Sequence, residues 1–244
     1  MDFQGKTAIV TGAAVGVGKA TAIQLANYGA NVVLVDRNEE TLTLALEQIP
    51  QKDRIMTFAC DVTDPQGALD CVAAAEKRFG SVDILVNNAG IWRCWGSFLE
   101  TSVEDWKQFI DVNMMGIVYF TKAALPGMLE RGWGRIVNVA SVAGVYGNAN
   151  MVHYSATKGA VISMTKALAK EVADRGVTVN SISPGMVNTS KDPDIDATMP
   201  NGASYIGRTG KARENADLIC FLASEQAAFI SGQNILIDGC RKSI

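Results

Sequence analysis

The sequence has few of the residues that metal centres and disulfides require. Its 244 residues include one histidine, His153, and five cysteines that lie far apart in the chain. An odd number of scattered cysteines, with no pair at metal-ligand spacing, predicts reduced thiols, a cytoplasmic location and no bound metal. The cysteines are Cys60, Cys71, Cys94, Cys220 and Cys240.

A surplus of basic residues and long apolar runs are also missing. The chain has 22 basic and 25 acidic residues and a formal charge of −3, so we expect no nucleic-acid partner. No segment reaches the ~18 uninterrupted apolar residues of a membrane-spanning helix, and MDFQGK has neither the basic nor the apolar region of a signal peptide. We therefore expect no membrane anchor.

Short apolar runs rich in β-branched residues alternate with segments of helical spacing. This order predicts an α/β protein with a doubly wound parallel sheet of about seven strands and helices on both faces. No linker, repeat or low-complexity tract interrupts this order, so we expect a single domain that spans residues 1–244. The runs begin at Lys6, Asn31, Ile55, Asp83, Arg135, Val177 and Asn234.

Capping residues predict several helix boundaries. Asp64 before a proline predicts an N-cap for a helix that ends near Gly80. Thr101 and Glu104 have the spacing of a capping box, and Pro126 predicts the end of a later helix or a kink in it.

One stretch is irregular. Residues 188–205, NTSKDPDIDATMPNGASY, are rich in Asp, Pro, Gly and small polar residues and follow a predicted strand. Such a length and position predict a substrate lid. A plain surface excursion is the alternative.

A glycine-rich loop, TGAAVGVG over residues 11–18, lies between a predicted strand and a helix. Gly12, Gly16 and Gly18 allow a tight turn and a close approach of phosphate to amides at a helix N-terminus, which predicts a dinucleotide ligand. Ordinary turns also use glycine, but here the loop belongs to a predicted βαβ unit.

An acid follows the second predicted strand. Asp36 stands 18 residues after Gly18, where a carboxylate accepts hydrogen bonds from the ribose hydroxyls of NAD and repels the extra phosphate of NADP. Arg37 could neutralise that phosphate, so NAD is the preferred interpretation and NADP stays open.

YSATKGA, residues 154–160, places a tyrosine and a lysine one helical turn apart on the same face. A tyrosine, with a reference pKa near ~10, acts as a base at neutral pH only where positive charge stabilises its phenolate. Tyr154 and Lys158 therefore indicate proton transfer at an alcohol oxygen. An exposed helix pair is the alternative.

With NNAG at residues 87–90, Ser141, and the spacing GxxxGxG of the glycine loop, the chain resembles the short-chain dehydrogenase/reductase family over nearly its whole length, up to GQNILIDG. The resemblance implies a Rossmann-type fold and NAD-dependent hydride transfer between nicotinamide and a secondary alcohol or ketone. A sensor without turnover would not need the tuned tyrosine. A methyltransferase leaves the Tyr/Lys pair unexplained, and an epimerase relative would have TGxxGxxG and a longer C-terminal region.

The resemblance assigns catalytic roles to four residues. Tyr154 would be the general acid/base, Lys158 would lower its pKa and hold the ribose, Ser141 would bind the substrate oxygen, and Asn113 would hold a water of the proton relay. The implied cofactor-binding residues are Gly12, Gly16, Val17, Gly18, Asp36, Asp61, Val62, Asn88, Tyr154, Lys158, Val187 and Thr189.

The implied substrate residues include an aromatic and cationic loop. Small apolar walls favour a neutral alcohol or ketone, and Arg93 leaves a carboxylate or thioester open. Beside Ser141, the candidates are Trp92, Arg93, Ala143, Asn148 and Met186.

The resemblance also implies a homotetramer or homodimer. The residues Met114, Met115, Ile117 and Phe120 suit such an interface and suit a monomer's core as well. His153, next to Tyr154, should point off the tyrosine's face and pack elsewhere.

Overall fold

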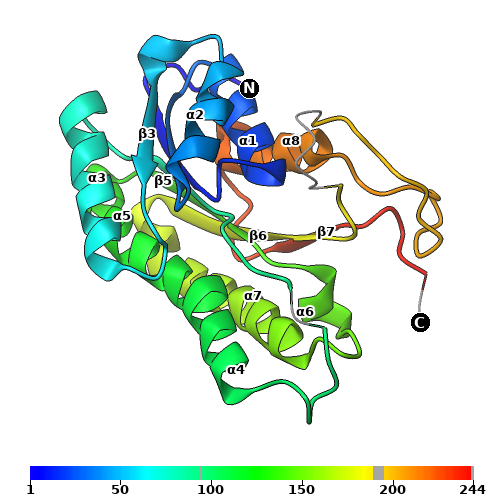
Figure 1. Ribbon diagram of the computed structural model, residues 1–244. Helices are drawn as coiled ribbons and strands as arrows, with labels where there is room; N and C mark the ends of the chain where they lie inside the picture. Colours follow the sequence, from blue (N-terminus) through cyan, green and yellow to red (C-terminus); the bar gives the residue numbers. More distant parts are fainter. Residues whose placement is uncertain (94, 189–194, 243–244) are drawn as a thin grey trace.

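The protein is described by a computed structural model covering residues 1–93, 95–188 and 195–242. Seven parallel strands form one sheet in the order β3-β2-β1-β4-β5-β6-β7, which confirms the predicted doubly wound fold (Figure 1). The strands are β1 (Thr7–Thr11), β2 (Asn31–Asp36), β3 (Ile55–Ala59), β4 (Ile84–Asn87), β5 (Gly134–Val139), β6 (Val177–Pro184) and β7 (Asn234–Ile237).

The central strands are buried along their whole length because helices cover both faces of the sheet. Every residue of β1, β4, β5 and β6 is buried, whereas the edge strands β3 and β7 are partly exposed. The helices are α1 (Gly16–Asn27), α2 (Glu39–Glu47), α3 (Pro65–Phe79), α4 (Val103–Ile110), α5 (Gly116–Arg131), α6 (Val142–Tyr146), α7 (Val152–Val172) and α8 (Ala212–Ala223).

Two apolar cores lie on opposite faces of the sheet. On one face, Leu25 of α1 and Ile219 of α8 belong to a cluster with residues of β1 and β2. On the other, Phe120 and Met128 of α5 and Val172 of α7 belong to a second cluster that includes α3. Figure 1 shows the same division, with α1, α2 and α8 above the sheet and α3, α5 and α7 below it.

Most predicted helix ends are confirmed. Asp64 caps α3, accepting the Gln66 N–H at 3.0 Å, and Gly80 ends the helix in the left-handed region with φ of 92°. The capping-box prediction was one residue early, because Ser102 caps α4. The Ser102 hydroxyl accepts the Asp105 N–H and the Asp105 carboxylate accepts the Ser102 N–H.

Two open expectations are narrowed by the structure. Pro126 does not end α5, which continues to Arg131, since a proline removes one helical donor while Ala124 and Met128 on either side pack in the core. Ile117 and Phe120 are buried, so of the two settings predicted for them, core and interface, they take the core. Among the described residues, no helix combines the length and apolar character needed to cross a membrane.

Candidate active site

The carboxyl ends of the strands converge on the loops that carry the predicted site residues. The chain crosses from β3 at one side of β1 to β4 at the other, so the glycine loop after β1 opens at a topological switch point. Ligands of doubly wound sheets bind at such points because the two neighbouring loops diverge there.

The glycine loop has the geometry that a dinucleotide phosphate requires. Gly12 and Gly16 have φ of 63° and 56°, in the region that favours glycine. A Cβ on Gly18 would lie 2.1 Å from the Gly12 carbonyl oxygen. Helix α1 begins at Gly16 with no side-chain cap and no acid in its first turn, so the amides of this turn suit a phosphate.

Asn88, which follows β4, forms hydrogen bonds with the glycine loop. Its Nδ2 donates to the carbonyl oxygens of Thr11 and Gly12 at 2.9 and 3.1 Å, and the Thr11 hydroxyl accepts the N–H groups of Asn88 and Ala89. The amide group therefore shapes the glycine loop, while its predicted contact with the ribose stays a prediction.

Asp36 lies at the mouth of the glycine loop. Its carboxylate accepts the Ala14 N–H at 3.4 Å and the Asn38 N–H at 3.3 Å, which fixes it at the end of β2. Asp61 is exposed, and its carboxylate accepts hydrogen bonds from the N–H and the hydroxyl of Thr63. Val62 is buried and packs against Gly116. These residues border the predicted adenosine half of the site.

The structure brings Ser141, Tyr154 and Lys158 together at the end of β5. Ser141 caps α6, and its hydroxyl lies near enough to the Tyr154 side chain to lower the pKa of the tyrosine. The Lys158 ammonium is buried, donates to the Val139 carbonyl at 2.7 Å and lies 5.9 Å from the centroid of the Tyr154 ring.

Helix α6 rests directly on the backbone of α7 beside the lysine. A Cβ on Gly144 would lie 2.5 Å from the Lys158 carbonyl carbon and 2.6 Å from the Gly159 nitrogen. Only glycine allows this approach. The contact fixes Ser141, at the start of α6, relative to Tyr154 on α7.

Asn113 belongs to a π-helical turn, Asp111–Met115, between α4 and α5. Its Oδ1 accepts the Ile91 N–H at 2.7 Å, and its Nδ2 donates to the Ile91 carbonyl and the Thr157 hydroxyl. A Cβ on Gly90 would lie 3.1 Å from Asn113 Oδ1 and 3.4 Å from Lys158 Nζ. The asparagine thus holds the chain after β4 against the lysine, and its part in a water relay stays a prediction.

Burial determines the pKa of both titrating side chains. It raises the pKa of Tyr154, which the nearby Ser141 hydroxyl lowers in part. It lowers the pKa of Lys158 to about 8, so the ammonium is still charged at neutral pH. The tyrosine therefore depends on the lysine and on any cationic ligand beside it to become a base.

Replacing Lys158 with methionine should stabilise the protein without cofactor. The pKa of this lysine is about 8 in the fold and 10.5 in an ordinary environment, so the burial cost is complete below pH 8 and disappears as pH rises toward 10.5. We expect K158M to gain about 1–3 kcal/mol of unfolding free energy at pH 7, after loss of the bond to Val139. Urea unfolding at pH 7 and pH 10, with K166M on the exposed face as control, measures it; a loss of stability at pH 7 would contradict it.

The predicted substrate residues differ in how far they are exposed. Trp92 and Met186 are more than half exposed, and Arg93 is exposed. Ala143 is buried and its N–H donates to the Ser141 hydroxyl. Val187 bridges to Gly210 beside the cleft, and Thr189 lies outside the described residues.

Asn148 has a partner that the sequence does not suggest. Arg241, from the C-terminal tail, donates through Nη2 to Asn148 Oδ1 at 3.0 Å. No local pattern connects residues 93 positions apart. The pair forms because the fold brings the tail beside the loop between α6 and α7.

His153 is fully buried behind the tyrosine. Its ring stands edge-on to Phe109 with centroids 4.2 Å apart, and Trp106 lies 6.0 Å away. Neither ring nitrogen has a hydrogen-bond partner among the described residues. The histidine therefore packs under the site, as expected, and Phe109 in turn contacts the Tyr154 ring.

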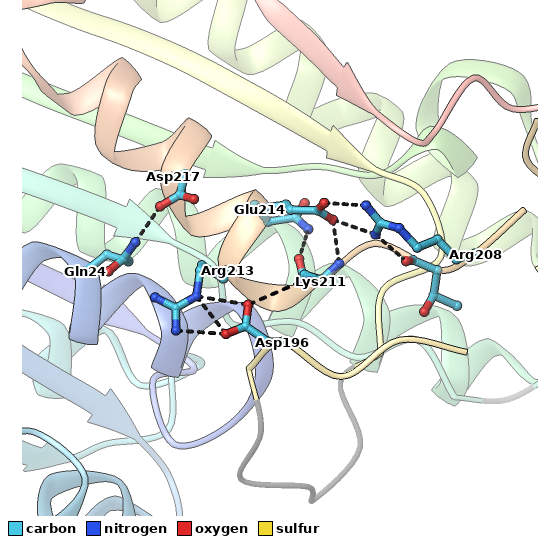
Figure 2. Close-up of polar contacts among 9 residues, drawn as sticks. Gln24, Asp196, Arg208, Lys211, Arg213, Glu214 and Asp217 are labelled. Carbon is cyan, nitrogen blue, oxygen red and sulfur yellow. Dashed lines mark hydrogen bonds and ion pairs between the residues drawn. The ribbon is translucent and has the colours of Figure 1, made fainter. Parts of the chain in front are cut away.

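Ion pairs hold the described end of the predicted lid against α8. Figure 2 shows Asp196 between Arg213, at 2.9 Å, and Lys211, at 3.8 Å, while Arg208 pairs with Glu214 at 2.6 Å. The Arg213 guanidinium lowers the pKa of Asp196, and Arg208 lowers that of Glu214. These contacts connect the segment after β6 to a helix that packs on α1.

Comparisons with known proteins identify the family of this chain. The sequence model of the short chain dehydrogenase family matches residues 6–200. The chain is 38% identical to the 3-oxoacyl-(acyl-carrier-protein) reductase FabG of Thermotoga maritima, covering 98% of each chain. It is 37% identical to the meso-2,3-butanediol dehydrogenase of Serratia marcescens and 35% identical to the cyclohexanol dehydrogenase of an Acinetobacter, with at least 95% of each chain covered.

The protein therefore belongs to the short-chain dehydrogenase family of oxidoreductases, which bind a nicotinamide cofactor.

Proposed function

We propose that the protein is an NAD-dependent enzyme that interconverts a secondary alcohol and a ketone. The observation that carries this proposal is the grouping of Ser141, Tyr154 and the buried Lys158 ammonium, which lies 5.9 Å from the centroid of the tyrosine ring. Two hydroxyls that converge on one point can hold a carbonyl or carbinol oxygen between them. By their names, the three relatives act on a 3-oxoacyl group, a diol and a cyclic alcohol, which supports such a substrate.

In the proposed mechanism, Tyr154 donates or accepts the proton of the reacting oxygen. In reduction the phenol donates this proton to the carbonyl oxygen, and in oxidation the phenolate accepts it from the alcohol. Ser141 holds the reacting oxygen, and the Lys158 charge favours the phenolate. A bound nicotinamide dinucleotide supplies or accepts the hydride. Phe109 and His153 keep the tyrosine ring in place.

The residues proposed for the cofactor fit that group. The first turn of α1 would hold the pyrophosphate, Asp36 the adenosine ribose, Asp61 and Val62 the adenine, and Val187 and Thr189 the nicotinamide amide. The close approach of Gly18 to the Gly12 carbonyl, which only glycine permits, supports this placement. We also propose that residues 188–205 form a lid over the substrate.

A dinucleotide assay tests this function. Absorbance of the reduced nicotinamide is recorded while the protein meets NAD and then NADP with cyclic, steroidal, polyol and hydroxyacyl alcohols. The proposal expects turnover with a secondary alcohol. Binding of the cofactor with no turnover across the panel would instead favour a sensor.

Asp36 should determine the cofactor preference. Its carboxylate, fixed by Ala14 and Asn38, would repel the 2′-phosphate of NADP. We expect kcat/KM for NAD to exceed kcat/KM for NADP by at least about tenfold. In D36N the ratio of these two values should fall by a similar factor. E39Q, an exposed acid at the start of α2, is the control. A wild-type preference for NADP would mean that Arg37 outweighs the carboxylate.

We further propose a cytoplasmic homo-oligomer, a tetramer or dimer. Met114 and Met115 are half-buried on the π-helical turn and remain available for an interface. Light scattering of the purified protein would give its mass.

A further inference from the structure

The C-terminal tail is fixed beside the loop between α6 and α7, which leads into the helix of Tyr154. After β7 it extends past the end of the sheet where α6 lies (Figure 1). The tail pairs with residues 203–206, since Tyr205 N–H donates to the Cys240 carbonyl, Ile206 N–H to the Gly239 carbonyl and Lys242 N–H to the Ala203 carbonyl. Three backbone hydrogen bonds give Arg241 a defined position.

From this position Arg241 reaches the loop that leads into the catalytic helix. Its Nη2 donates to Asn148 Oδ1 at 3.0 Å, and the Asn148 N–H donates to the Ser155 hydroxyl at 3.1 Å. Ser155 follows Tyr154 on α7. Two hydrogen bonds therefore connect the guanidinium to the neighbour of the proposed acid/base.

Among the residues that the structure describes, no acid balances the charge of Arg241. The side chain is half-buried, its bond to Asn148 goes to a neutral amide, and no carboxylate in the described ranges lies within ion-pair distance. Asp238, the acid on the tail, accepts the Cys240 N–H. A guanidinium has five N–H donors in a planar fork that matches carboxylate or phosphate oxygens.

Exposed aromatic side chains stand near the same loop. The Gly96 N–H donates to the Asn150 carbonyl at 3.1 Å, which brings the segment with Trp95 beside residues 147–151. Trp95, Tyr146 and Tyr205 are each at least 60% exposed. A cation among exposed apolar rings suits a ligand with an apolar body and an anionic end.

We propose that Arg241 is a specificity-determining residue that binds an anionic group of the substrate, a carboxylate or a phosphate, at the entrance of the cleft. The proposal rests on the proposed function, which it narrows to anionic ketones and alcohols. The bond to Asn148 orients the guanidinium, and its remaining donors face the ligand's charge.

The test compares matched substrates that differ only in charge. Linear methyl ketones that end in a carboxylate, their methyl esters, and ketones of equal length that end in a phosphate monoester are assayed with NADH and NADPH. The wild type should prefer the anionic members. In R241Q the ratio of kcat/KM for acid over ester should fall about 10- to 100-fold, and R241K should restore part of it. K242Q, which alters the next cation on the tail, should keep the ratio. The carboxylate and phosphate arms show which anion is preferred.

Other results of the same assay would overturn the proposal for Arg241. An unchanged acid-to-ester ratio in R241Q, even with both rates lowered, would mean that Arg241 only positions Asn148 and would overturn the proposal. If the wild type turns over no ketone, calorimetric titration with the acid and the ester decides the matter. Selective acid binding that R241Q abolishes would keep the anion site while the proposed function fails, and equal or absent binding would reject the site.

Discussion

Replacing Tyr154 with phenylalanine is expected to lower kcat about 10²- to 10⁴-fold. The change removes the hydroxyl that would exchange the proton, while the ring stays edge-on to Phe109, with the two ring centroids 6.3 Å apart. Folding should therefore be preserved, and binding of the dinucleotide should fall far less than turnover. Steady-state kinetics with circular dichroism of both proteins measures the two effects.

A second tyrosine provides the matched control. Tyr146 lies exposed at the end of α6, and Y146F should retain turnover close to the wild-type value. Near-normal turnover by Y154F would show that another group moves the proton, and the mechanism proposed for Ser141, Tyr154 and Lys158 would be wrong.

The second large effect is expected at the glycine loop. In G18A the added Cβ would lie 2.1 Å from the Gly12 carbonyl oxygen and 2.5 Å from Asn88 Nδ2, so the loop or α1 must move. Because the backbone atoms cannot move aside as a side chain could, we expect a loss of about 2–4 kcal/mol of unfolding free energy. The dinucleotide should bind at least about tenfold more weakly.

Urea unfolding and calorimetric titration with NAD measure both consequences. G202A is the control, since a Cβ there would meet nothing within 4 Å and Gly202 does not have a positive φ. Wild-type stability and affinity in G18A would contradict the close approach on which the proposed phosphate site depends.

The fold could be predicted because the strands carry their signal locally. A parallel sheet covered on both faces requires continuous apolar strands, and β1 and β6 are buried at every residue. Helix ends were less certain, since two adjacent hydroxyl residues, Thr101 and Ser102, both suit a cap. Only the backbone geometry selects Ser102, whereas the Thr101 hydroxyl donates to the Phe98 carbonyl.

The site could be predicted where a motif places its residues close in sequence. Tyr154 and Lys158 share one helix, and the glycine loop is contiguous. The supporting contacts join distant segments and have no such pattern. The bond of Lys158 to Val139, the closure of Asn113 on Ile91 and the reach of Arg241 to Asn148 all depend on the tertiary fold.

Packing selects between the two settings predicted for two apolar residues. Ile117 and Phe120 follow the π-helical turn and point into the core, where they contribute to clusters on α5. An apolar residue on a helix has the same sequence signature in a core and in an interface. The neighbouring helices α3 and α7 decide between them.

Transfer of deuterium from substrate to cofactor distinguishes a dehydrogenase from a protein that only binds nicotinamide. A secondary alcohol with deuterium on its carbinol carbon, chosen from the substrates that the assay identifies, is incubated with the protein and NAD, and the reduced nicotinamide is analysed by mass spectrometry. We expect deuterium in the reduced nicotinamide with the wild type and strongly reduced transfer with Y154F. If the alcohol and NAD both bind and no deuterium is transferred, the protein does not catalyse the proposed hydride transfer.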